Sequence, residues 1–180
     1  MSFATFADSI RRRLNIVPSG ERQGISLDRS GMCWSVQAGD EHVPVMLRCF
    51  AALFPPDALL YVEGTSITRT LREFLHSRRA EQVTPVRVGT LWPRPYRFHM
   101  PIHQGNLSRL ATLIEGRPLR ELCDHMHVYQ GQTVLLEAYD AINDHVDLSP
   151  MIAEDRMQSF SKQLGTRYRL VRATECRARW

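Results

Sequence analysis

Apolar residues recur at helical spacing in several stretches of the chain, and this pattern predicts amphipathic helices. The clearest stretch contains Val43, Met46, Leu47, Phe50 and Phe54, and Pro55 and Pro56 follow it. We expect five helices, over about 3–14, 43–54 and 67–79, then one from Asn106 or Ser108 to Gly116, and one from Ser149-Pro150 to Gly165.

Other stretches alternate between apolar and polar residues or are rich in β-branched residues, which predicts strands. We expect strands at about 24–28, 32–37, 58–63, 84–91, 96–102, 124–129, 133–137 and 166–172. The first two would form a hairpin around Arg29-Ser30-Gly31, and the fourth and fifth would flank "WPRP". The acidic stretch 138–150 is interpreted as a turn between strands.

Strands and helices alternate along the chain, but hairpins dominate, which favours an α+β fold. The expected architecture is a single globular domain over 1–180. It has an antiparallel or mixed sheet of about 6–9 short strands and about five helices packed mainly on one face.

The stretch "HMHVYQGQTVLLE" contains a β-hairpin whose register decides where two histidines point. A two-residue Gln130-Gly131 turn would place His125 and His127 in an apolar row. A three-residue loop with left-handed Gly131 would instead place them opposite Glu137 and its neighbours. A slip of one residue turns every side chain to the other face, so burial selects the register strongly, and we expect the three-residue loop.

Other expected strands also have one apolar side and one side that carries Arg or His. Because helices cover only the apolar side, the second face of the sheet is expected to be uncovered. This face would collect the candidate binding residues Arg87, Arg97, His99, His125, His127, Arg167 and Arg169, together with Glu137.

Composition and charge narrow the functional classes. The formal net charge is +4, which is too small to demand nucleic acid as a partner. Among the 23 basic residues only Lys162 is lysine, a bias that GC-rich coding alone can produce. Arginine nevertheless favours bidentate recognition of carboxylate or phosphate. The four cysteines are far apart, and we find neither a secretory signal nor a membrane-spanning run, so a cytoplasmic protein is expected.

The candidate face supports two functional hypotheses. The first is a non-enzymatic intracellular domain of the bacterial adaptor or immunity-protein type, which binds an acidic protein or a small anionic ligand through the Arg/His face. The alternative is a metal-dependent hydrolase whose ligands are His125, His127 and Glu137. Neither catalytic residues nor a cofactor is assigned, nucleic acid and membrane are not expected partners, and a homodimer remains open.

Overall fold

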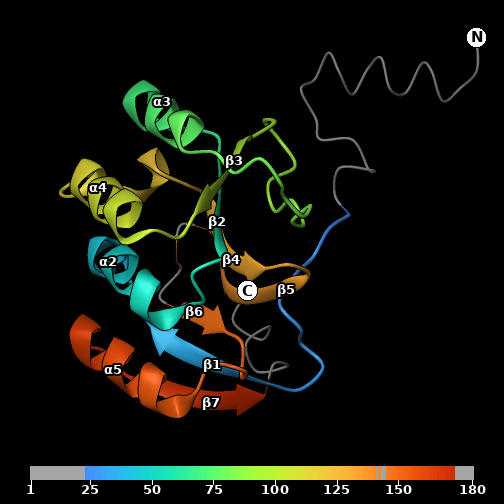
Figure 1. Cartoon of the computed structure of the whole chain (residues 1–180), viewed down its shortest axis with the longest axis vertical. Coiled ribbons are helices and arrows are strands. Elements are labelled where there is room, and N and C mark those ends of the chain that lie inside the picture. Colours follow the sequence, from blue (N-terminus) through green and yellow to red (C-terminus); the bar gives the residue numbers. More distant parts are fainter. Residues whose placement is uncertain (1–22, 141, 143–144, 173–180) are drawn as a thin grey trace, which may run out of the picture.

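The computed structural model describes residues 23–140, 142 and 145–172, which form a sheet with helices packed on one face (Figure 1). Seven strands lie in the order β3-β2-β4-β5-β6-β1-β7, and every neighbouring pair is antiparallel. The strands are β1 (Met32–Gln37), β2 (Leu59–Gly64), β3 (Tyr96–Pro101), β4 (His125–Gln130), β5 (Thr133–Ala138), β6 (His145–Leu148) and β7 (Tyr168–Arg172). The α+β prediction with an antiparallel sheet is therefore confirmed.

The helices form one layer that buries the apolar side of the sheet (Figure 1). They are α2 (Val43–Leu53), α3 (Arg69–Ser77), α4 (Gln104–Ile114) and α5 (Glu154–Leu164), with short 3-10 turns η2 (Asp40–His42) and η3 (Leu119–Glu121). Leu60, Val62, Met126 and Val128 from the central strands are fully buried beneath this layer. The described residues contain four α-helices where about five were expected, and the helix predicted over 3–14 lies outside them.

Local hydrogen bonds explain why one predicted helix start is wrong. Ser149 was expected to cap the last helix. Instead, its hydroxyl accepts a hydrogen bond from the Met151 N–H, and its carbonyl accepts one from the Ile152 N–H. These bonds close a separate turn, so α5 begins only after Ala153. The predicted end is confirmed, because Gly165 caps α5 in the left-handed conformation with φ of 68°.

Two predicted hairpins do not form. The segments 24–28 and 84–91 are not strands of the sheet, and they meet each other in a single parallel bridge between Ile25 and Val86. β1 instead pairs with β6 and β7. β6 lies in the stretch that was interpreted as a turn. This strand has only four residues, and one of them, Asp147, is acidic.

The β4–β5 hairpin places His127 and Glu137 on one face, as expected, but its loop and register differ from those predicted. Gln130 pairs with Thr133, so the loop has two residues, with Gly131 in the left-handed conformation at φ of 55°. A β-bulge then shifts the register, so that Tyr129 pairs with Val134 while Val128 pairs with Leu136. The bulge returns His127 to a position opposite Glu137, and the expected three-residue loop is wrong.

Two chain segments, residues 23–31 and 84–90, cover much of the second face of the sheet; we call them the covering segments. Their backbones are joined by hydrogen bonds from Ile25 N to Pro85 O and from Arg87 N to Ile25 O. Leu27 and Val86 are buried between the covering segments and the sheet, with Tyr61 and Tyr129. The expectation that this face is uncovered is therefore wrong.

Close packing of the covering segment at Gly89 gives the first prediction. A Cβ at Gly89 would lie 2.5 Å from Cδ2 of His125, a buried ring that cannot move aside freely. We expect Gly89→Ala to lower the free energy of unfolding by about 1–3 kcal/mol. Gly105→Ala on α4 is the control, because a Cβ at that position would meet no other atom within 4 Å. Urea unfolding of both variants measures the difference, and equal stabilities would contradict the packing described.

Candidate functional site

A row of mostly polar side chains crosses the whole sheet on the face opposite the helices; we call it the polar row. Cross-strand pairing joins neighbour to neighbour, one residue from each strand. In strand order the members are His99, Tyr61, His127, Glu137, Asp147, Ser35 and Arg169. A second, shorter row pairs Arg97 with Glu63 and Glu63 with His125.

Glu137 is the most heavily bonded member of the polar row. Its side chain is 1% exposed, and Oε2 accepts from Arg29 Nη2 at 2.7 Å. Oε1 accepts from the Leu27 N–H at 3.3 Å and from the Tyr139 hydroxyl at 2.9 Å. Arg29 also lies 3.4 Å from Asp147 Oδ2. Burial has the largest single effect and disfavours the Arg29 charge. The bond to Glu137 and the charges of Glu137 and Asp147 together outweigh burial, so the pKa of Arg29 is raised.

Glu63 is held in the same manner by the other covering segment. This residue is fully buried, and Oε1 accepts from the Thr90 N–H at 2.6 Å. Oε2 accepts from the Tyr61 hydroxyl at 2.6 Å and from the Gly89 N–H at 3.3 Å. Burial, reinforced by the Glu63 charge, raises the pKa of Tyr61 well above its usual value, so this tyrosine stays protonated.

His127 lies between two tyrosine rings and is fully buried. Its Nδ1 is 3.6 Å from Glu137 Oε1, and neither ring nitrogen has a hydrogen-bond partner among the described residues. Burial lowers the pKa of His127 to about 4, and the Glu137 charge opposes this only in part. The ring is therefore neutral at pH 7.

His125 and His99 complete the set of predicted histidines on this face. The Asp140 N–H donates to His125 Nδ1 at 3.1 Å, which leaves Nε2 directed at Glu63 Oε1, 3.9 Å away. His99 Nδ1 lies 2.8 Å from the Tyr129 hydroxyl. Burial, with the Arg97 charge as a second cause, lowers the pKa of His99 to about 4.

The residues predicted to bind a metal ion in the hydrolase hypothesis do not form a suitable set of ligands. Within the residues that the structure describes, no three His, Cys, Asp or Glu side chains are arranged to hold a metal ion. The predicted trio of His125, His127 and Glu137 fails because Glu137 is already bonded to Arg29, whose charge repels a cation. The arrangement therefore gives the metal hypothesis no support.

The predicted arginines lie around the covered face instead of forming one patch. Arg97 and Arg169 are exposed on β3 and β7, and Arg87 is exposed on a covering segment. β3 and β7 are opposite edges, six strand spacings of about 4.8 Å apart, or roughly 29 Å. The sheet therefore does not bring the seven predicted binding residues together.

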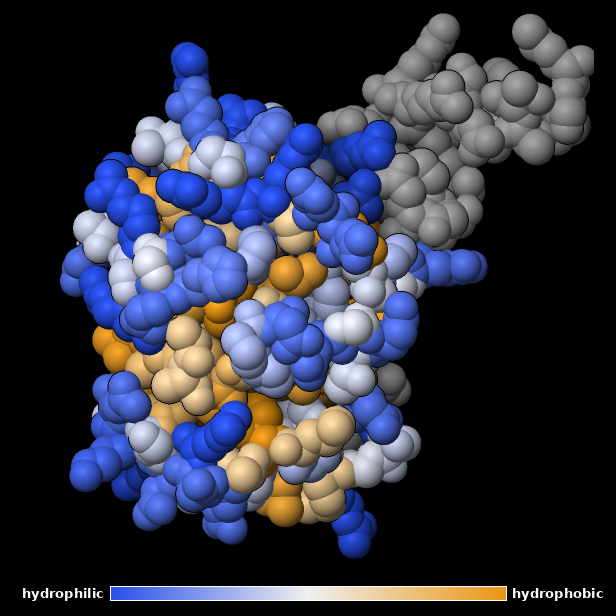
Figure 2. All heavy atoms as spheres, in the orientation of Figure 1, coloured by the Kyte–Doolittle hydropathy of each residue, from blue (hydrophilic) through white to orange (hydrophobic). Residues whose placement is uncertain are grey.

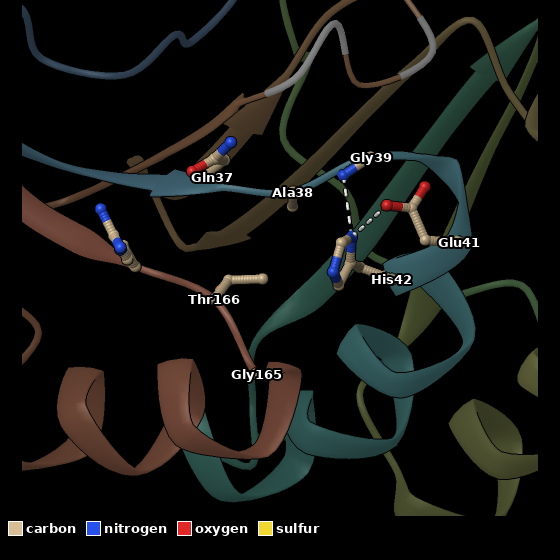
Figure 3. Close-up of a pocket in the computed structure, with 8 residues that line it drawn as sticks. Gln37, Ala38, Gly39, Glu41, His42, Gly165 and Thr166 are labelled. Atoms are coloured by element: carbon tan, nitrogen blue, oxygen red, sulfur yellow. Dashed lines mark hydrogen bonds and ion pairs between the residues drawn. The ribbon is translucent and has the colours of Figure 1, made fainter.

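Arg167 lines an open cleft of about 450 Å³ between the end of β1 and the turn from α5 to β7. Figure 3 shows Gln37, Gly39, His42 and Thr166 around it. His42 Nδ1 accepts from the Gly39 N–H at 3.0 Å and lies 3.1 Å from the Glu41 carboxylate. Because Glu41 also lines the cleft, it opposes the binding of an anion beside Arg167.

Sequence analysis missed an exposed apolar segment next to β3. Trp92 is 67% exposed, and Leu91 and Tyr96 are each nearly half exposed. The Arg72 guanidinium lies 4.5 Å from the centre of the Tyr96 ring. We call residues 91–97 with Arg72 the arginine–aromatic surface. "WPRP" was expected only to separate two strands, although Pro93 and Pro95, which directly follow Trp92 and flank Arg94, also indicate a rigid, exposed segment.

Comparisons with known proteins add nothing to this geometry: no family model, curated protein or solved structure matches the chain. Among the described residues, no helix is both long enough and apolar enough to pass through a bilayer.

The buried Arg29–Glu137 pair gives the second prediction. We expect Arg29→Met to lower the free energy of unfolding by about 3–5 kcal/mol, because it leaves Glu137 charged, buried and without its cation. Arg29→Met combined with Glu137→Met should recover part of that loss. Arg69→Met, which breaks the exposed pair with Glu73, is the control and should leave stability nearly unchanged. Urea unfolding measures all three, and equal losses for Arg29→Met and Arg69→Met would contradict the burial.

The neutral His127 gives the third prediction, which concerns pH. The pKa of His127 is about 4 in the folded protein and 6.5 in the unfolded chain. The neutral ring therefore makes its full contribution to the free energy of unfolding above pH 6.5. That contribution disappears as the pH falls from 6.5 to about 4, at a cost on the order of 3 kcal/mol.

We expect His127→Phe to flatten this part of the stability–pH curve, measured by urea unfolding at a series of pH values. Met126→Leu is the control on the same strand, and it should shift the curve without changing its slope. An unchanged slope in His127→Phe would show that the ring does not titrate as described.

Proposed function

We propose that this protein is a non-enzymatic binding domain that recognises an acidic protein segment through the arginine–aromatic surface. The observation that carries the proposal is the solvent-exposed Trp92, with Arg94 and Arg97 within five residues of it. Tryptophan, tyrosine and arginine are the residues most enriched at the energetic centres of protein interfaces.

The position of this surface supports binding. The segment between α3 and β3 projects beyond the sheet on the side away from the helices (Figure 1). Its base is fixed, because Gly89 and Thr90 are bonded to the buried Glu63. Pro93 and Pro95 restrict the backbone between Trp92 and Tyr96. A fixed segment loses less conformational entropy on association than a free one.

Charge supports an acidic partner. Arg72 stacks on Tyr96, and the exposed Arg94 and Arg97 lie in the same segment. Arginine pairs with carboxylates in bidentate geometry and stacks on aromatic rings. A small formal net charge of +4 favours an acidic peptide over nucleic acid, which needs a longer basic track.

The buried histidines support a binding role over catalysis. His125 and His127 lie beneath the covering segments, and the carboxylates beside them are occupied by backbone and tyrosine donors. A general base must reach the proton that it removes, and neither ring reaches the surface in this conformation.

A direct binding measurement tests the proposal and is the fourth prediction. A fluorescently labelled peptide of alternating acidic and apolar residues is titrated with the protein, and anisotropy is followed at two salt concentrations. We expect Trp92→Ala to weaken binding by about 30-fold, as loss of an interface anchor does. Arg97→Glu should weaken binding most at low salt.

Arg109→Glu on α4, an exposed arginine away from this surface, is the matched control and should leave affinity within about twofold. An equal loss in Arg109→Glu would contradict the proposed site. Tighter binding of a single-stranded oligonucleotide than of the peptide would replace the acidic protein with nucleic acid as the partner.

A further inference from the structure

The two edges of the sheet differ in how well they are closed. At one edge, the Ala80 N–H donates to the His99 carbonyl of β3 at 2.8 Å. Pro95 precedes β3 and Pro101 ends it, and prolines blunt an edge because they offer no N–H. At the other edge, β7 pairs with β1 on one side, and no strand of the described ranges lies on its other side.

The direction of the backbone groups of β7 follows from one backbone hydrogen bond. The Gln37 N–H donates to the Arg167 carbonyl at 3.0 Å, which makes these residues a hydrogen-bonded antiparallel pair. Hydrogen bonding alternates along such a ladder, so Arg169 and Val171 also turn toward β1. The N–H and C=O groups of Tyr168, Leu170 and Arg172 must then point outward.

We infer that β7 is the contact edge of a two-fold symmetric dimer of this protein, in which the β7 strands of two copies pair antiparallel with Leu170 at the axis. In this register Leu170 faces Leu170 of the second copy. Tyr168 faces Arg172, and Arg169 faces Val171. The outward-pointing backbone groups at all three positions then gain partners.

Self-complementarity of charge and polarity favours a second copy as the occupant of this edge. The register places no arginine directly opposite another arginine, and it brings Tyr168 beside Arg172, a pair suited to cation–π stacking. Leu170 is 46% exposed on the side of the buried Trp34, and Met32 on the adjacent strand is 38% exposed. Pairing would cover Leu170 on both copies at once, as an isologous interface requires.

Apolar surface near this edge is consistent with the inference. In Figure 2 apolar atoms are visible at the lower end of the molecule, where α5 and β7 lie in Figure 1. Because a single strand pair buries a small area, the dimer should be weak, with Kd in the micromolar range or above, as is typical of interfaces below about 1,200 Å². The two sheets would join into one with β3 at each outer end.

The fifth prediction tests the dimer by sedimentation velocity of the full chain over a concentration series. We expect the wild-type protein to associate to a dimer as its concentration rises. Leu170→Lys should remain monomeric at every concentration, because it opposes two ammonium groups across the axis, while half-exposed Leu170 tolerates lysine in the monomer. Leu170→Val, which keeps an apolar β-former and the backbone N–H, is the control and should still dimerise.

Cross-linking tests the register. In a chain with Cys176→Ser, Leu170→Cys should form an intermolecular disulfide under mild oxidation, since hydrogen-bonded antiparallel partners have Cα atoms about 5.5 Å apart. Arg169→Cys should not, because its counterpart lies diagonally, about 7–8 Å away. The described cysteines Cys33, Cys49 and Cys123 are buried and contribute no background.

Three outcomes would overturn the inference. They are a wild-type protein that stays monomeric throughout, a dimer that Leu170→Lys leaves intact, and a disulfide that forms as readily at position 169 as at position 170. The first would indicate that this edge is closed within one chain, and the second would place the contact elsewhere.

Discussion

The rest of the structure depends on the need to satisfy two carboxylates that the sheet places away from water. Glu63 and Glu137 lie on neighbouring rows of the second face, and an ionised carboxylate inside a protein is tolerated only with several donors around it. Tyr61 on β2 and Tyr139, directly after β5, each donate a hydroxyl hydrogen bond. The other donors come from two distant segments, Leu27 and Arg29 for Glu137, and Gly89 and Thr90 for Glu63. Satisfying the carboxylates therefore closes the face.

This closure divides the molecule into a helical layer, a sheet and a thin irregular layer with different physical roles. The helical layer is held by apolar burial, which is not directional. The irregular layer is held mainly by charge-assisted hydrogen bonds, which fix both position and orientation. A segment anchored in this way can present an exposed Trp92 without a helix or strand of its own. The binding surface that we propose is therefore anchored to Glu63, the same carboxylate that holds Gly89 against His125.

Alternation along the chain was enough to predict the α+β class and to place His125, His127 and Glu137 on one face. It could not show whether this face meets water, because a polar face against solvent and a polar network under a cover alternate in the same way. The deciding contact joins Arg29 and Glu137 across 108 residues, and no local pattern encodes it. The bulge at Leu135 was missed for a similar reason, since it corrects a register that only the packed sheet defines. Pro93 and Pro95 after Trp92 were visible in the sequence, but prolines alone do not reveal which side chains a turn exposes.

Arginine side chains lie both against the covered face and at its border. The covered face contains the carboxylates of Glu63, Glu137 and Asp147, and Arg29 contacts the last two directly. The exposed Arg87 and Arg97 lie at the border of this face. Burial raises the pKa of both Tyr61 and Tyr139. The Arg97 charge lowers the pKa of Tyr61 in part, and the Arg87 charge does the same for Tyr139. The two charges thus favour the ionised form of these tyrosines through space, while the guanidinium groups stay at the surface. An acidic partner that reaches Arg97 would approach the same field, so binding and the stability of the covered face are expected to be coupled electrostatically.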